Sequence, residues 1–190
     1  MKSKKWTLIL TSLTALTLMT ACGQSTTKSS TTAAADTTAI TTSAKNSQSS
    51  YFTEKDYDTS YDESTASKIE LSGSSANVSG DGVTVSGSTV TISKAGTYVI
   101  SGQSDGVQIK IAADKSDDVK LVLKGASMTN TDAAISATSA GHVYLTLAEG
   151  TTNSPSDSSS NSDEKANAAL FSKFDLTING SGTLNVDGKK

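Results

Sequence analysis

The one cysteine of this 190-residue chain, Cys22, stands where its thiol can receive a lipid. Three early lysines precede an apolar stretch from Trp6 to Met19, and Thr20 and Ala21 then lead into the cysteine. This order is typical of a secretory signal with a small-residue cleavage site, and a cysteine directly after it predicts a lipobox. We therefore expect export, diacylglycerol transfer to Cys22 and cleavage before it. An ordinary secretory peptide with a chance cysteine is the alternative. A membrane-spanning helix is not expected, because about 14 apolar-biased residues are fewer than the roughly 20 that such a helix needs.

Oxygen-bearing side chains gather at the end of a polar stretch, residues 151–166, that we expect to form a loop protruding from one face. Asp163, Glu164 and Asn167 lie close together there. Calcium takes carboxylate, amide and carbonyl oxygens as ligands, often in loops, so these three residues are candidate calcium ligands. Solvated turn chemistry is the alternative, because the sequence has neither an EF-hand pattern nor a nonapeptide Gly-Asp repeat.

The residues needed for catalysis are sparse. His142 is the only histidine, and no G-x-S-x-G elbow accompanies it, so we interpret it as an exposed residue at a strand end. A lyase that removes a proton next to a carboxylate uses an arginine or lysine base. The chain has no arginine, and a lysine base would need a strongly lowered pKa that nothing in the sequence indicates. No catalytic residue is predicted.

Three side chains carry the chemistry of sugar recognition. Tyr144 can stack on a pyranose ring if it faces outward, and Lys120 and Lys124 can pair with uronate carboxylates from one strand face. The alternative for the lysines is a solubilising role at the surface.

Composition narrows the classes of partner. The three lysines before the apolar stretch leave with the leader, so the net charge falls from −3 to −6. An acidic protein is poorly suited to bind nucleic acid. With one cysteine there is no internal disulfide and no cysteine-based zinc site.

Composition also divides the chain into three parts. Residues 1–21 form the signal, and residues 22–50 form a Ser/Thr-rich linker that we expect to be disordered, as a stalk above the membrane. Residues 51–190 form the folded domain. Its first stretch, 51–68, mixes aromatic and acidic residues. We expect it to dock on the domain as a short helix or lead-in cap, the alternative being a strip that binds a partner.

Short runs of Val, Ile, Leu, Thr and Tyr follow from Ile69 onward, separated by Gly, Asp, Asn and Ser. Such runs predict strands, with glycines at the corners. No stretch has a helical period over more than two turns. The domain is therefore expected to be all-β, with a strand-rich lead-in cap at its N-terminal end.

An internal repeat predicts how the strands are arranged. Residues 121–125 (LVLKG), 145–150 (LTLAEG) and 176–180 (LTING) share an apolar–variable–apolar core that closes on glycine. Short strands recurring at this spacing predict a parallel β-helix, in which Leu121, Leu145 and Leu176 stack inside. Lys120, Lys124, Tyr144, Thr146 and Thr177 would face outward. A β-sandwich is the alternative.

The end of the domain is less regular. About three coils fit, by the repeat length, and no terminal cap is visible before residue 190. An uncapped β-helix exposes strand edges that invite pairing. We expect either that the domain is incomplete at its C-terminus or that a partner covers this end.

Several blocks together resemble a known family. They are residues 52–56, 61–64, 69–73, 95–102, 118–125, 167–173 and 175–182. They are similar to blocks of bacterial carbohydrate-binding-domain-containing surface proteins whose fold resembles pectate lyases. The resemblance implies a right-handed parallel β-helix with bound calcium, binding of acidic polysaccharide such as polygalacturonate, and no strong catalysis. Family members usually continue for many more coils.

The sequence thus predicts a lipoprotein on the extracellular face of the bacterial membrane that binds polysaccharide without catalysis. The alternatives are a truncated calcium-dependent polysaccharide lyase and an adhesin or wall-spacing module with no glycan ligand.

Overall fold

The computed structural model describes residues 51–161 and 163–189. The predicted signal, the lipid site at Cys22 and the linker 22–50 lie outside the described residues. Within the described residues, no helix has the length and apolar content needed to cross a membrane.

The regular secondary structure of the described residues is strand apart from one short helix, as the short β-branched and aliphatic runs predict. Inside β1 and β6, buried residues such as Ile69 and Ile109 alternate with exposed ones. The elements are α2 (Glu54–Tyr57), β1 (Ser67–Gly73), β2 (Ser75–Ser79), β3 (Val83–Ser86), β4 (Thr89–Ile92), β5 (Gly96–Asp105), β6 (Gln108–Ala112), β7 (Asp118–Thr129), β8 (Ile135–Ser139), β9 (His142–Leu147), β10 (Thr152–Ser156), β11 (Leu170–Ser172), β12 (Asp175–Gly180) and β13 (Thr183–Leu184).

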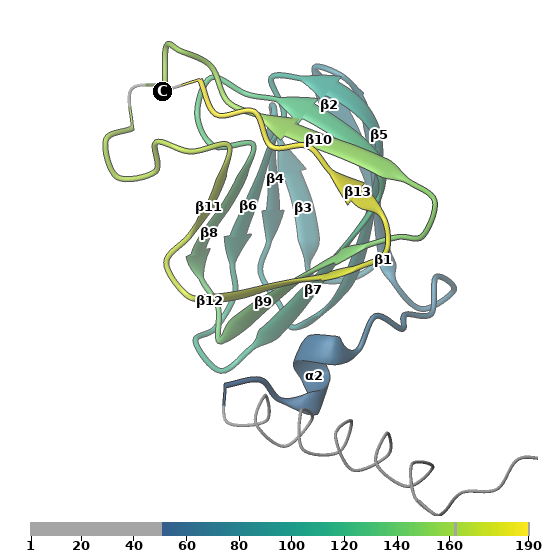
Figure 1. The fold of residues 1–190 in the computed structure, drawn as a ribbon. Coiled ribbons are helices and arrows are strands. Elements are labelled where there is room, and N and C mark those ends of the chain that lie inside the picture. The colour runs from purple at the N-terminus through teal and green to yellow at the C-terminus, as the bar shows by residue number, and fades with distance from the viewer. Residues whose placement is uncertain (1–50, 162, 190) are drawn as a thin grey trace, which may run out of the picture. The chain divides into compact units, whose positions relative to one another are not determined.

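Two sheets enclose the core (Figure 1). Sheet A has the order β12-β9-β7-β5-β1-β2, with β10 pairing to the later part of β7 and β13 pairing to β10. Sheet B has the order β11-β8-β6-β4-β3. From β5 onward every pairing between named strands is parallel, because the chain crosses to the other sheet before it returns beside an earlier strand. Antiparallel sandwich packing, the alternative from the sequence, is therefore wrong.

The hairpins β1–β2 and β3–β4 are the antiparallel pairs, and they precede the parallel ladders. They form the strand-rich lead-in that was expected before the repeat. Within the β1–β5 pairing, Gly102 lies opposite Leu71 with a φ of +87°, and a Cβ there would overlap the carbonyl oxygen of Leu71. Only glycine fits this approach of two backbones without strain.

Side chains stack inside the ladders, but the third level differs from the expected register. Leu121 pairs with Leu145, as predicted. Leu176 pairs with Val143 rather than Leu145, whose partner is Ile178. The shift is two residues, which preserves the face that each side chain takes because strands have a period of two. The inward set was therefore predicted correctly, and its neighbours along the stack were not.

A buried amide connects three parts of the ladder. The side chain of Asn153 in β10 is fully buried. Its Oδ1 accepts hydrogen bonds from the backbone N–H groups of Gly125 and Ala126 at 3.0 and 2.9 Å, and its Nδ2 donates to the carbonyl of Thr183 at 3.2 Å. These contacts satisfy backbone groups that the change of partner strand leaves without a ladder bond.

Candidate functional site

The candidate site is the outer face of sheet A, where β7, β9 and β12 lie side by side. Their pairing aligns three rungs of outward-pointing residues: Asp118–His142–Asp175, Lys120–Tyr144–Thr177 and Val122–Thr146–Asn179. This grid brings together cations, carboxylates, hydroxyls and an aromatic ring. Such groups can hydrogen-bond to and stack on a sugar.

Residues 53–60, which we call the strap, cover this grid. The helix α2 lies within it, and the carboxylate of Asp56 accepts hydrogen bonds from the backbone N–H and the hydroxyl of Thr53 at 2.7 and 2.8 Å. Docking of the 51–68 segment was expected to use its aromatic residues. Tyr61 does so, by packing against the cluster of Val99, Val122 and Ala148. Tyr51 and Tyr57 are 89% and 57% exposed, and polar groups make the contacts of residues 53–60.

Asp56 is buried at the centre of the grid. The hydroxyl of Thr177 donates to its Oδ1, and Nε2 of His142 lies 2.9 Å from the same hydroxyl and 3.7 Å from the carboxylate. Asn179 donates to the Asp56 carbonyl at 3.0 Å. The hydrogen bond from Thr177, followed by that from the Thr53 backbone, holds the pKa of Asp56 below its usual range.

Lys120 is enclosed by acceptors from the strap. Its Nζ donates to Oδ2 of Asp58 at 3.0 Å and to the carbonyls of Asp58 and Ser60 at 3.1 and 2.9 Å. Its side chain is 16% exposed. The hydrogen bond from the Ser60 hydroxyl, followed by that from Lys120, lowers the pKa of Asp58 to about 2. The predicted sugar-binding lysine thus already holds a carboxylate.

Two more ion pairs join the N-terminal segment to β7. Lys124 lies 2.7 Å from Glu63 and Lys55 lies 2.9 Å from Asp118. Each pairing is by a hydrogen bond and charge attraction, which raise the pKa of both lysines and lower that of Glu63. All four side chains are more than 40% exposed, so water weakens these pairs.

Tyr144 points to the outer face, as the strand period predicts, but it is not in solvent. It is 6% exposed and its ring stacks on that of His142, with centroids 4.2 Å apart and planes 6° from parallel. Burial raises the pKa of its hydroxyl. Tyr144 and Thr146 face outward as expected, but the N-terminal segment covers both. His142 was expected to be exposed and is instead part-buried beneath the same segment.

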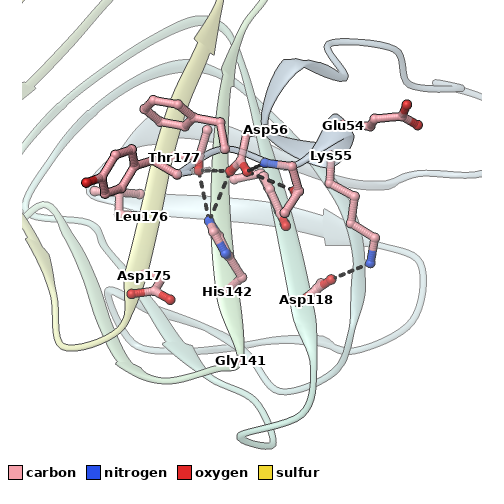
Figure 2. A pocket seen from close by; sticks show the side chains of 13 residues that line it. Glu54, Lys55, Asp56, Asp118, Gly141, His142, Asp175, Leu176 and Thr177 are labelled. Carbon is pink, nitrogen blue, oxygen red and sulfur yellow. Dashed lines mark hydrogen bonds and ion pairs between the residues drawn. The ribbon is translucent and has the colours of Figure 1, made fainter. Parts of the chain in front are cut away.

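An open groove of about 850 Å³ runs between the strap and the sheet, and Figure 2 shows its lining. Tyr51 and Phe52 form part of its wall, together with Glu54, Asp118 and Asp175. Lys55 is the one lysine of its lining, and its raised pKa keeps it protonated. A protonated lysine cannot accept a proton from a substrate.

The predicted calcium ligands lie elsewhere, in the loop between β10 and β11. Asp163, Glu164 and Asn167 are all exposed. Oδ1 of Asp163 accepts from the backbone N–H groups of Lys165 and Ala166 at 2.9 and 3.2 Å, an arrangement that stabilises a turn. Over residues 51–161 and 163–189, no three His, Cys, Asp or Glu side chains group as metal ligands. Calcium binding stays a prediction.

Comparison with known proteins identifies the family. The family profile for carbohydrate-binding domain-containing proteins matches residues 86–190, more than half of the chain. The chain belongs to this family. The family region 86–190 contains the whole grid of β7, β9 and β12, whereas the strap precedes it.

Two relatives add detail. A carbohydrate-binding domain-containing protein of Acetivibrio thermocellus is 37% identical over 101 residues, which are 50% of this chain and 35% of that protein. A solved structure of a polysaccharide lyase-like protein from C. thermocellum, in a gadolinium derivative, has a TM-score of 0.62 and 35% identity, over 65% of this chain and 53% of the other. The chain thus spans about a third to a half of these relatives.

Sequence reasoning missed the residues that complete the site. Thr177 was expected to face outward, but its pairing with Asp56 joins positions far apart in the chain. The acidic residues of the strap were recognised as a group, yet no signal assigned Asp56 to Thr177 or Asp58 to Lys120. One indication of these pairings was present in the sequence. Residues 53–63 are rich in carboxylates, and lysines expected to face outward follow in β7.

Proposed function

We propose that this protein binds polysaccharide on the outer face of sheet A without cleaving it. One observation carries the proposal: within the family region, Lys120 holds a carboxylate and two further oxygens on a face that also presents an aromatic ring. A uronate residue offers the same set of acceptors, one carboxylate beside hydroxyl and ring oxygens.

An acidic glycan, such as polygalacturonate, is the proposed ligand class. Its carboxylates would pair with Lys120 and Lys124, and a sugar ring would stack on Tyr144. Calcium, if bound by Asp163, Glu164 and Asn167, would be held in the loop between β10 and β11. The supporting observation is the 2.7 Å pair of Lys124 with Glu63, a second carboxylate held on β7.

The proposed fold is a short right-handed parallel β-helix. The parallel ladders and the alternation of the chain between two sheets favour it. Crossovers between parallel strands are right-handed in almost all proteins, which favours that hand.

We propose that the protein is not an enzyme. Lyase chemistry needs a basic side chain that can accept a proton at neutral pH. Lys55 in the groove has a raised pKa, and the lowered pKa of Asp56 removes it as a proton donor. The other basic side chain of the groove, His142, directs its Nε2 at the Thr177 hydroxyl and the Asp56 carboxylate beneath the strap. A weak calcium-dependent lyase and an adhesin with no glycan ligand are the other candidates.

The proposed location is the outer face of the cell membrane, through a lipid on Cys22. The variant Cys22→Ser should leave the membrane fraction and lose labelling by a radioactive fatty acid. Retention and labelling in that variant would exclude the lipid site.

A glycan panel separates the functions. The full chain is incubated with immobilised polygalacturonate, neutral plant glycans and cell-wall protein, with and without a chelator. Retention on a polysaccharide, with no unsaturated product absorbing in the ultraviolet, supports the proposal. Formation of that product would identify a lyase, and retention on protein alone would identify an adhesin. Loss of glycan binding with the chelator would support calcium.

A further inference from the structure

We propose that the strap occupies the binding site for an acidic polysaccharide, and that an incoming uronate chain displaces it. This inference rests on the proposed function and adds to it. The site is the rung Lys120–Tyr144–Thr177 with its neighbours on β9 and β12, and the strap is its occupant in the uncomplexed protein.

The first argument is chemical likeness between the strap and the ligand. The ammonium of Lys120 has three protons and all three are directed at strap oxygens: the Asp58 carboxylate, the Asp58 carbonyl and the Ser60 carbonyl. At the other end of the rung, Thr177 gives its proton to the Asp56 carboxylate. A uronate chain carries carboxylates and hydroxyls at repeating intervals, so it can replace these acceptors one for one.

The second argument is that the strap leaves buried groups unsatisfied. Among the described residues, three buried side-chain polar atoms lack a hydrogen-bond partner, and two of them, Thr146 Oγ1 and Asn179 Oδ1, belong to the covered grid. Thr146 lines a cavity of about 300 Å³ beside Thr59 and Tyr61. Unpaired buried polar groups destabilise the state that contains them. A ligand rich in hydroxyls can satisfy groups that the strap does not.

The third argument is how the strap is attached. Within residues 53–60 the large apolar side chain, Tyr57, is 57% exposed, so burial of apolar surface does little to hold the strap. Apolar packing begins after it, where Tyr61 and Ala66 contact the cluster around Val122. The strap is therefore held by polar contacts that another polar chain can exchange, next to a segment that stays anchored.

The fourth argument is the position of the strap in the sequence. Lys120, Tyr144 and Thr177 all lie within the family region 86–190, and the strap lies before it. The covered face is therefore made of strands from the family region, and the residues that cover it lie outside that region. Its carboxylates neutralise a lysine that would otherwise attract any polyanion.

The test compares affinities for polygalacturonate of the full chain and of Asp58→Asn. This change keeps the shape of the side chain and removes the charge that faces Lys120. If the strap competes, weakening it raises the apparent affinity, by about threefold to tenfold, since the competent fraction of molecules increases. The matched control is Asp81→Asn, which breaks an ion pair of 2.9 Å with Lys94 away from the grid and should leave the affinity unchanged.

Hydrogen exchange gives a second readout on the same samples. Added polygalacturonate should speed exchange at the amides of Asp56 and Asp58, which are bonded to the carbonyls of Thr53 and Lys55. Equal affinity of Asp58→Asn and the unchanged chain, or slower exchange in the strap with ligand, would overturn the inference while glycan binding itself stood. Absence of binding to every polysaccharide by both proteins would instead overturn the proposed function, and the inference with it.

Discussion

At the scale of single residues, Asn153 shows how one side chain connects segments that are distant in the chain. Its amide bonds to backbone groups of residues 125, 126 and 183 from a fully buried position. The sequence places Asn153 in a polar stretch that was expected to be a protruding loop. Burial of an asparagine depends on which backbone groups surround it, and nothing in the local sequence encodes them.

The variant Asn153→Ala tests this role. It removes the acceptor for two backbone N–H groups and should lower the free energy of unfolding by about 2 kcal/mol, the cost of leaving buried donors unpaired. Urea denaturation of the full chain measures it. Asn77→Ala in β2, at an exposed position, is the control and should change stability little. Equal effects of the two variants would show that the buried amide does not stabilise the fold.

The sequence pattern predicted to which face of the sheet each side chain points, but not which residues surround it. The period of two in β7 and β9 correctly places Lys120 and Tyr144 on the outer face. Their environment is set by the strap, which is about sixty positions earlier than Lys120. Because a single sequence contains no pairing information over that distance, the cover on Tyr144 could not be predicted.

At the scale of elements, the strap has a pH dependence that follows from its carboxylates. The strap faces Asp118, Lys120, His142 and Tyr144 on the sheet. The pKa of Asp56 and of Asp58 is below the ordinary value of 3.8 when the strap is docked, that of Asp58 being about 2. Protonation therefore favours the undocked strap, and docking is complete only above the ordinary pKa.

We expect the strap to be released as the pH falls from about 4 towards 2 while the core stays folded. Nuclear magnetic resonance measures it through the amide signals of Asp56 and Asp58, with the buried Leu121 as the reference for the core. In Asp58→Asn the transition should lose part of its amplitude. A strap whose signals do not move before those of Leu121 would contradict this account.

The internal repeat was the most informative feature of the sequence. It did not determine the register in which β12 pairs with β9. The apolar pattern identifies which residues face inward, and the parallel ladders confirm that choice for Leu121 and Leu145. The register of β12 depends on the turn at residues 173 and 174, and the pattern alone fits two positions equally. This is why Leu176 was assigned to the wrong partner.

The loss of stability on truncating an inward side chain should depend on how deeply it is buried in its stack. Leu121 and Ile178 belong to the same stack, but Leu121 is fully buried and Ile178 is 49% exposed. Leu121→Ala should lower the free energy of unfolding by about 3 kcal/mol. Ile178→Ala, as the matched control, should lower it by less than about 1 kcal/mol. Denaturant titration measures both, and similar losses would mean that the stack does not carry the core.

At the scale of the whole molecule, the proposed binding face must offer positive charge on a protein that is acidic overall. The chain is acidic overall, with a net charge of −3, so a polyanionic ligand needs a local site of the opposite sign. Lys120 on β7 can provide it once the strap, with the Asp58 carboxylate that neutralises this lysine, is displaced. Binding should therefore weaken as salt is raised, because added ions screen a charge-driven association.

The most direct test of polysaccharide binding at this face is calorimetric titration of the full chain with oligogalacturonides. Because Lys120 also holds Asp58, the comparison uses the Asp58→Asn background, where that ion pair is already broken. Adding Lys120→Ala should weaken binding by about tenfold, the loss of one charged hydrogen bond. Adding Lys110→Ala, at an exposed position on sheet B, should leave it unchanged. Equal affinities with and without Lys120 would contradict a binding site on the outer face of sheet A.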